Sequence, residues 1–171
     1  MSMIILCASA GMNVKLSETL LETAKNLGGE VELINLVDLN LPLYSTVEEK
    51  ANGIPDAAKT LSEKLGAAKS FVVVAPEYNG TLPPVLNNAV AWVSRRGDEW
   101  RVAFGGKLAA VATHSGGGGQ KVLNAMRVQL EHLGCTVIAR ELLTHYQKQL
   151  NPESAEAVLK QLISWSSVIE A

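Results

Sequence analysis

The stretch FVVVAPEYNGTLPPVLNNAVAWV, residues 71–93, contains the signals that decide the fold. Residues 71–75 form a β-branched apolar run that is too short for a helix and is typical of a strand buried on both faces. From Val85 onward, apolar side chains recur at helical spacing. Pro84 suits a first helical position, where its missing N–H costs nothing, and it pushes Pro83 out of the helical region. The stretch therefore predicts a strand, a short polar loop and a helix whose first backbone donors are free.

The rest of the chain alternates between the same two kinds of segment, which is typical of βα units. Apolar runs predict strands at 3–8, 31–36, 71–75, 107–113 and 136–143, and helical spacing predicts helices at 13–27, 55–68, 85–92, 120–133 and from 152 through Trp165 and Ile169. This alternation predicts an α/β fold, a flavodoxin-like doubly wound five-stranded parallel sheet in the order 2-1-3-4-5 with helices on both faces. Residues 1–171 are interpreted as a single domain, in which the segment 37–53 is expected to be irregular.

The composition is that of a globular protein. Of the 171 residues 47% are hydrophobic, and the formal net charge of -2 gives no reason to expect a nucleic-acid partner. No apolar run is long enough to span a bilayer, and residues 1–10 lack the basic leader of a signal peptide. Cys7 and Cys135 form no CxxC motif and are predicted to be reduced, buried thiols. These features predict a cytoplasmic protein without a membrane partner.

Three loops are expected to meet at one edge of the sheet. In the 2-1-3-4-5 order the chain reverses between the first and third strands, and ligands bind outside the carboxyl ends of the strands at such a switch point. The loops that follow the first, third and fourth strands therefore converge on one crevice. They are residues 9–13, 76–81 and 113–119.

The first of these loops is a candidate anion site. Ser9 supplies a hydroxyl, and Gly11 and Asn13 lead into a helix whose free N–H groups and dipole favour a phosphate. The alternative is a helix cap, in which the Asn13 side chain satisfies the first turn of its own helix.

The loop after the fourth strand is a glycine run. Gly116 to Gly119 follow Thr113, His114 and Ser115, and packing does not explain so many glycines, because they lose much entropy on folding. Close approach of the backbone to a ligand is one interpretation, and a flexible connector is the other. The run does not follow the Walker pattern, since Lys121 is not in a GK[ST] sequence.

One motif carries a family resemblance. The sequence PEYNGT at 76–81, followed by Pro83, Asn88-Ala89, Trp92 and Ser94-Arg95, resembles the signature of the NADPH-dependent FMN reductase family. Thr113, Gly118-Gly119 and Met126-Arg127 match that family more loosely. The resemblance extends through nearly the whole chain, and it implies an FMN cofactor and NAD(P)H as hydride donor. It further implies a small acceptor (a quinone, flavin, azo compound or metal oxyanion).

The loops and the resemblance together predict the cofactor-binding residues. They are Ser9, Asn13, Pro76, Glu77, Tyr78, Asn79, Gly80, Thr81, Thr113, Ser115, Gly116 and Gly117. The resemblance implies that 77–80 line the flavin ring. Asn79 would serve through its amide or by adopting an unusual backbone angle, and Tyr78 would stack near the ring or cover it. The alternative is a structural turn, with Glu77 solvated and Tyr78 a surface aromatic.

The first loop departs from the family pattern. Asn13 and Leu16 match its Asn-x-x-Leu ending, but the arginine and second serine that usually precede this ending are missing. A second hypothesis is therefore a family member that has lost FMN through this shortened loop. A third is a flavodoxin-like one-electron carrier, although such carriers tend to be more acidic than this chain.

Other candidate residues carry less information. The histidines at 114, 132 and 145 lack metal-ligand spacing, so no metal is expected, and no residue is assigned a catalytic role. An aromatic and basic cluster could receive anionic phosphates or form a subunit contact. It comprises Trp92, Arg95, Arg96, Trp100 and Arg101. The resemblance implies a homodimer or homotetramer, with the helix at 85–92 and the loop near Tyr44 at the contact.

Overall fold

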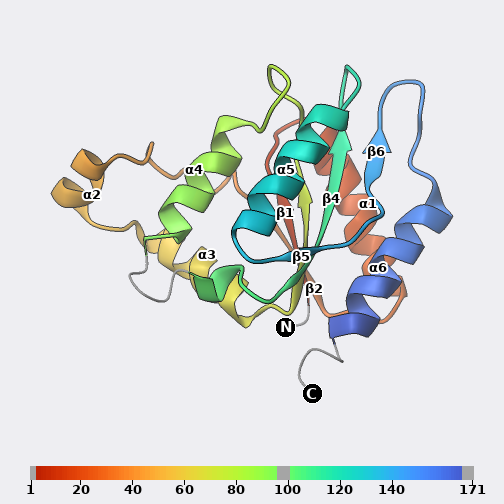
Figure 1. The fold of residues 1–171 in the computed structure, drawn as a ribbon, viewed down its shortest axis with the longest axis horizontal. Helices are drawn as coiled ribbons and strands as arrows, with labels where there is room; N and C mark the ends of the chain where they lie inside the picture. The colour runs from red at the N-terminus through yellow and green to blue at the C-terminus, as the bar shows by residue number, and fades with distance from the viewer. Residues whose placement is uncertain (1–2, 96–100, 167–171) are drawn as a thin grey trace.

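Six parallel strands form one sheet in the part of the chain that the computed structural model describes, residues 3–95 and 101–166. They are β1 (Met3–Cys7), β2 (Val31–Asn35), β3 (Ser70–Val74), β4 (Leu108–His114), β5 (Thr136–Val137) and β6 (Leu142–Thr144). Their order is β2-β1-β3-β4-β5, and β6 also pairs with β4. The predicted order 2-1-3-4-5 is confirmed, and all the carboxyl ends point to one edge, the upper one in Figure 1.

The prediction of one continuous strand at 136–143 is wrong. Val137 pairs with Ala109, and Leu142 pairs with Ala112. The chain therefore advances five residues from Val137 to Leu142 while β4 advances three, and the two extra residues bulge out of the ladder. Arg127 holds this bulge from the adjacent helix. Its guanidinium donates hydrogen bonds of 3.2, 3.0 and 3.4 Å to the carbonyls of Val137, Ile138 and Ala139.

Six helices accompany the sheet in the described residues. They are α1 (Met12–Asn26), α2 (Thr46–Asn52), α3 (Asp56–Ala67), α4 (Pro84–Val93), α5 (Gln120–His132) and α6 (Pro152–Ser166). Five of them correspond to predicted helices. None of the described helices combines the length and apolar character needed to cross a membrane.

Helix α2 contradicts the prediction that 37–53 is irregular. The Ser45 hydroxyl caps it by accepting a hydrogen bond of 3.0 Å from the Glu48 N–H, and Gly53, at φ 75°, ends it. None of its residues is buried, so no apolar periodicity marks it in the sequence. Figure 1 shows α2 at the far end of the molecule, beyond α4.

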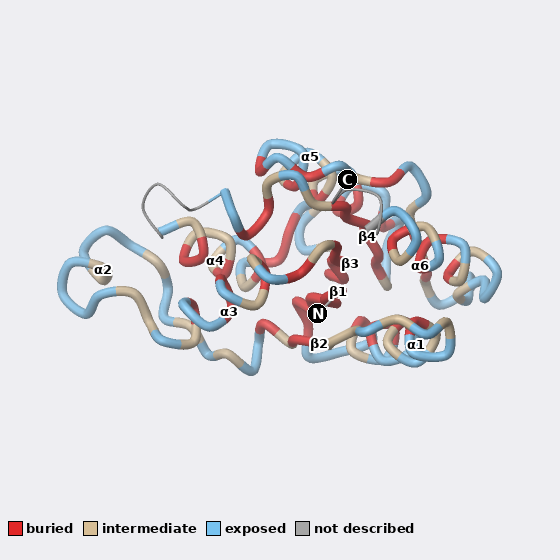
Figure 2. Tube along the Cα trace, turned by 90° about the horizontal axis from the view of Figure 1, so that it is seen from below, coloured by how far each residue is buried: buried red, intermediate tan, exposed pale blue. Residues whose placement is uncertain are grey.

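The sheet lies between two layers of helices. Figure 2 shows the buried strands with α1 and α6 on one side and α3, α4 and α5 on the other. Alternate residues of β1 enter the two cores, since Ile4 and Leu6 join one cluster and Met3 and Ile5 join the other. All five residues of β1 and of β3 are buried, which is why their sequences are continuous apolar runs.

The apolar face of the last helix is shorter than the sequence predicts. Val158 and Leu162 are fully buried, but Trp165 is 49% exposed. Ile169, the next residue of the predicted stripe, lies outside the described residues.

Candidate functional site

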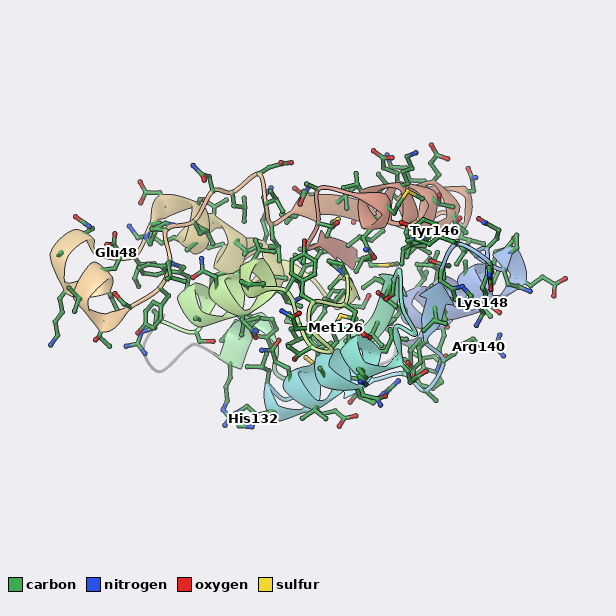
Figure 3. All side chains as sticks on the ribbon, turned by 90° about the horizontal axis from the view of Figure 1, so that it is seen from above. Glu48, Met126, His132, Arg140, Tyr146 and Lys148 are labelled. Atoms are coloured by element: carbon green, nitrogen blue, oxygen red, sulfur yellow. The ribbon has the colours of Figure 1, made fainter. Side chains whose placement is uncertain are left out.

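The loops after β1, β3 and β4 adjoin one another at the carboxyl edge of the sheet. The Ala8 N–H donates to the Val74 carbonyl at 2.9 Å, and the Ala75 N–H donates to the Ala112 carbonyl at 3.2 Å. The Thr113 hydroxyl donates to the Ala75 carbonyl at 2.6 Å. Strand pairing thus continues to the first residues of the loops, and it brings the predicted residues of all three loops to the edge viewed in Figure 3.

Asn13 joins the first loop to the end of β4. Its amide N–H donates to the His114 carbonyl at 2.9 Å, and its Oδ1 accepts from the His114 N–H at 2.7 Å. Asn13 is 2% exposed, so this two-bond clasp is shielded from water. The side chain is therefore not a cap for its own helix, and it fixes the distance between two loops of the candidate site.

The N-terminus of α1 is open. Within residues 3–95 and 101–166 no side chain caps it, and its first turn contains no acidic residue. The Ser9 hydroxyl accepts from the Gly11 N–H at 3.0 Å, which shapes the loop in front of the helix. Helix N–H groups left in this way carry partial positive charge and favour an anion.

Residues 78–81 form a tight hairpin turn. The Tyr78 N–H and the Thr81 N–H each donate to the other residue's carbonyl at 3.0 Å. Asn79 and Gly80 have φ angles of 51° and 76°, as a type I′ turn requires. Asn-Gly is the sequence typical of such turns, so backbone conformation accounts for Asn79 at this position. Tyr78 and Thr81 are exposed beside the turn.

The hairpin also contacts the start of α5. The Glu77 carboxylate accepts from the Val122 N–H at 3.4 Å, and a Cβ placed on Gly80 would lie 3.3 Å from the Cδ of Lys121. Glu77 is therefore half-buried against a helix N-terminus rather than fully solvated. Pro76, which leads into this loop, is also half-buried.

The glycine run contains glycines of two kinds. Gly119 has φ 75°, and a Cβ there would lie 2.8 Å from Leu143 Cδ1, so only glycine fits. Gly116 to Gly118 are exposed, a Cβ on any of them would meet nothing closer than 3.7 Å, and none has a positive φ. Packing and backbone geometry explain Gly119 but leave the other three unexplained.

This arrangement suits a phosphorylated flat cofactor such as FMN. The open N-terminus of α1 can receive a phosphate, and Gly116 to Gly118 are exposed, so their backbone can approach a ligand closely. Ser115 supports this surface, because its buried hydroxyl accepts from the Gly117 N–H at 3.2 Å. Thr113 lies beneath it, fully buried. The residues present therefore fit the cofactor that the resemblance implies.

The aromatic and basic cluster lies away from this edge where the structure describes it. The buried Trp92 donates from Nε1 to the Pro42 carbonyl at 2.7 Å, and Arg95 pairs with the Glu49 carboxylate at 3.0 Å. These contacts attach the segment around α2 to the end of α4 that lies opposite the site. Arg96 and Trp100 lie outside the described residues.

Both cysteines are buried thiols without a catalytic environment. Burial raises the pKa of Cys7 above its ordinary value and that of Cys135 to about 12. Thiols of this kind stay protonated at neutral pH and are poor nucleophiles.

His114 is the one histidine that the sequence places in the crevice, and the structure puts it at this edge. Its peptide is held by Asn13, and its ring Nδ1 lies 3.1 Å from the Thr144 hydroxyl. Its position directly after the fourth predicted strand is what predicted this placement.

Comparisons with known proteins agree with this geometry. The family model described as NADPH-dependent FMN reductase matches residues 1–149. A quinone reductase of Escherichia coli is 29% identical over 123 residues, which cover 70% of this chain and 64% of that protein, less than two thirds of its length. An NAD(P)H-dependent FMN reductase of Pseudomonas aeruginosa is 36% identical over 85 residues, which cover 49% of this chain and 44% of that protein.

The fold has a solved counterpart over nearly its full length. FerB of Paracoccus denitrificans, a flavoenzyme NAD(P)H:(acceptor) oxidoreductase, superposes with a TM-score of 0.79 at 20% identity, covering 98% of this chain and 97% of that one. At that identity the likeness shows a shared flavodoxin-like fold. The family match covers most of the sequence, including all three loops of the site. The chain therefore belongs to the NADPH-dependent FMN reductase family.

Proposed function

We propose that this protein is an FMN-dependent NAD(P)H oxidoreductase that reduces a small acceptor. The observation that carries the proposal is the meeting of an uncapped helix N-terminus and three exposed glycines at one switch point of the sheet. FMN supplies the hydride-accepting and hydride-donating chemistry when bound. The protein therefore has to bind the cofactor, orient it against the substrates and exclude competing reactions.

The residues of the site divide this work between them. The Ser9 loop and the first turn of α1 would hold the phosphate, since no described side chain caps the N–H groups at the start of the helix. The backbone of 116–118 and the 78–81 hairpin would hold the ring from two sides. Asn13 keeps the first and third loops in register by its clasp on His114.

The outer side of the site would take the nicotinamide and then the acceptor. Tyr78 is 54% exposed on the hairpin, where its ring can cover a flat molecule. An open site with no acid–base pair suits acceptors that take hydride or electrons readily, such as a quinone, a flavin, an azo compound or a metal oxyanion. The proposal covers this class of acceptor.

The protein is further proposed to be a cytoplasmic homodimer or homotetramer. Free cysteines suit a reducing compartment. Leu43 and Val47 are 79% and 75% exposed, and Asn88 and Trp92 of α4 hold the chain just before them. This apolar surface, with α4 behind it, is the proposed subunit contact.

Titration with FMN tests the proposed function. The purified protein should quench FMN fluorescence at one equivalent per chain and should then oxidise NADPH when a benzoquinone is supplied. Binding of FMN without NADPH oxidation would instead favour a one-electron carrier. A protein that neither retains nor binds FMN would show that the shortened first loop has abolished the site.

Gly117→Val provides the residue-level test. The position has an ordinary φ and open space, so the fold should tolerate valine while the side chain occupies the cofactor surface. FMN affinity should fall at least about tenfold with no change in urea stability. Gly66→Ala, in α3 on a different part of the molecule, is the control and should leave FMN affinity unchanged.

A further inference from the structure

Lys121 lies where two walls of the proposed flavin site meet. It is the second residue of α5 and follows Gly119, which closes the glycine run. Its side chain extends over the 78–81 hairpin, since a Cβ built on Gly80 would lie 3.3 Å from its Cδ and 3.9 Å from its Nζ. Figure 1 shows the loop after β3 and the start of α5 at the upper edge of the sheet. A residue anchored next to the glycine run thus places its ammonium group on the hairpin.

The absence of a side chain at Gly80 makes this placement possible. Gly80 is half-buried, and the stem of Lys121 lies directly on its backbone. Lysine stems commonly pack in this way while the ammonium group stays in water. The position of the charge is therefore set by the turn, which is itself fixed by the two hydrogen bonds between Tyr78 and Thr81.

The charge of Lys121 is not neutralised by a neighbouring carboxylate. Lys121 is exposed, and among the described residues its ammonium group forms no ion pair. Glu77, the acidic residue of the adjoining loop, directs its carboxylate to the Val122 N–H at 3.4 Å. Arg127, the next cation along α5, donates to the carbonyls of the bulge. Of the two cations, Lys121 is therefore the one available to a molecule in the crevice.

Hydride transfer changes the charge of the proposed cofactor. NAD(P)H gives up a hydrogen with two electrons and becomes NAD(P)⁺, and FMN takes up that hydride and gains one negative charge on its ring system. A cation held beside a group on which negative charge develops stabilises the product of the step more than the reactant. Charges near the ring are among the features by which a protein tunes a flavin. An ammonium group at this position thus favours the reduced cofactor.

We propose that Lys121 stabilises the negative charge of reduced FMN and so raises the reduction potential of the bound cofactor. The inference rests on the proposed function, in which the hairpin and the glycine run hold the ring from two sides. Lys15 provides the contrast. It belongs to the start of α1, where the phosphate would bind and where hydride transfer changes no charge.

Equilibrium reduction of the FMN-loaded protein against a reference dye tests the proposal. In Lys121→Met the ratio of the affinities for reduced and oxidised FMN should fall about tenfold, which lowers the midpoint potential of the two-electron couple by about 30 mV. Lys121→Arg keeps the charge and should stay close to the parent protein. Because Lys121 is exposed, urea stability should be unchanged in both variants.

Lys15→Met is the matched control. It also removes one lysine, but at the phosphate end of the site, so it should leave the midpoint potential unchanged whatever its effect on FMN affinity. The comparison is made at about 0.15 M salt, where exposed charges more than about 8 Å apart are largely screened from each other.

The possible results separate this inference from the proposed function. A parent protein that binds no FMN would contradict both. If the parent binds FMN and Lys121→Met keeps its midpoint potential, the role of Lys121 is overturned and the proposed function stands. Equal shifts in Lys121→Met and Lys15→Met, or in Lys121→Met and Lys121→Arg, would also overturn it. A raised KM for NADPH at an unchanged potential would overturn it too, because Lys121 would then pair with a phosphate of the dinucleotide.

Discussion

At the scale of single residues, the candidate site depends on residues that fix the backbone conformation of its loops. Asn79 occupies the first left-handed position of the 78–81 turn, at φ 51°, and Gly119 occupies a left-handed position where a Cβ would meet Leu143. Both the nitrogen and the oxygen of the Asn13 amide form hydrogen bonds with the backbone of His114. Each of these residues orders a loop that a ligand would contact through main-chain groups.

Two substitutions of Asn79 separate the roles of its amide and its backbone. Asn79→Gly keeps the type I′ turn, so we expect FMN affinity and stability close to those of the parent protein. Asn79→Ala strains the turn by about 1 kcal/mol and should weaken FMN retention. Fluorescence titration and urea unfolding measure both effects. A Gly variant that loses FMN as severely as the Ala variant would assign the amide a direct contact.

Neighbouring glycines provide a stability test within one loop. Gly119→Ala combines a left-handed alanine with a contact of 2.8 Å to Leu143 Cδ1, and we expect it to lower the free energy of unfolding by about 2–4 kcal/mol. At Gly118 a Cβ would meet nothing within 4 Å, so Gly118→Ala should change stability by less than about 0.5 kcal/mol. Urea denaturation of the two variants compares them directly. Equal losses would show that the loop relaxes around Gly119.

At the scale of elements, the split between β5 and β6 is held by one side chain. Arg127 donates hydrogen bonds to three backbone carbonyls at the bulge, and its guanidinium also lies 4.0 Å from Glu131 and from Glu141. A planar group with several donors suits this task, whereas lysine presents a single point charge.

Arg127→Met should therefore destabilise this edge of the sheet. We expect a loss of about 2–3 kcal/mol, since hydrogen bonds from a charged donor are removed and three carbonyls lose their partner. Arg127→Lys should recover less than half of the stability that Arg127→Met loses. Amide hydrogen exchange of residues 136–144 reports the local opening, and residues of β1 serve as the internal control. Uniform loss of protection in both regions would mean that the bulge is not held locally.

At the scale of the whole molecule, one feature lies outside the two-layer plan. Helix α2 extends past α4 and is held there by Trp92, Asn88 and the pair of Arg95 with Glu49. Its neighbourhood carries exposed Leu43 and Val47. Apolar side chains on an element with no buried residue of its own are typical of a contact surface.

Val47→Glu tests the proposed subunit contact. Val47 is 75% exposed in the single chain, so the variant should fold normally but should shift the sedimentation profile towards the monomer. Val128→Glu, on α5 and 67% exposed, is the control and should leave the association state unchanged. Dissociation by the Val128 variant alone would move the contact to α5.

The sequence predicted most of the elements because their signals are local or periodic. Strands buried on both faces read as apolar runs, and the helices that cover them carry apolar stripes. Helix α2 and the β5–β6 bulge were missed for a shared reason. Neither depends on an apolar pattern, since α2 is capped by Ser45 and buries nothing, and the bulge depends on Arg127 from another element.

The candidate site was predictable in position and less so in the roles of its residues. Topology alone brings the ends of β1, β3 and β4 together, so the three loops were identified without coordinates. The partner of Asn13 was not, because it lies 101 residues away along the chain. The same holds for Glu77, whose carboxylate accepts from a helix that begins 43 residues later.

Strand order, the position of the candidate site and membership of a reductase family could all be predicted from the sequence, because apolar periodicity and a compact motif are properties of neighbouring residues. The hydrogen-bond partners of the polar groups at this edge became known only from the three-dimensional structure. The Asn13 amide binds the peptide of His114, Gly116 to Gly118 are exposed, and among the described residues no side chain caps α1 and none bonds to His114 Nε2. Those outcomes depend on hydrogen bonds between segments distant in sequence, which no local pattern encodes.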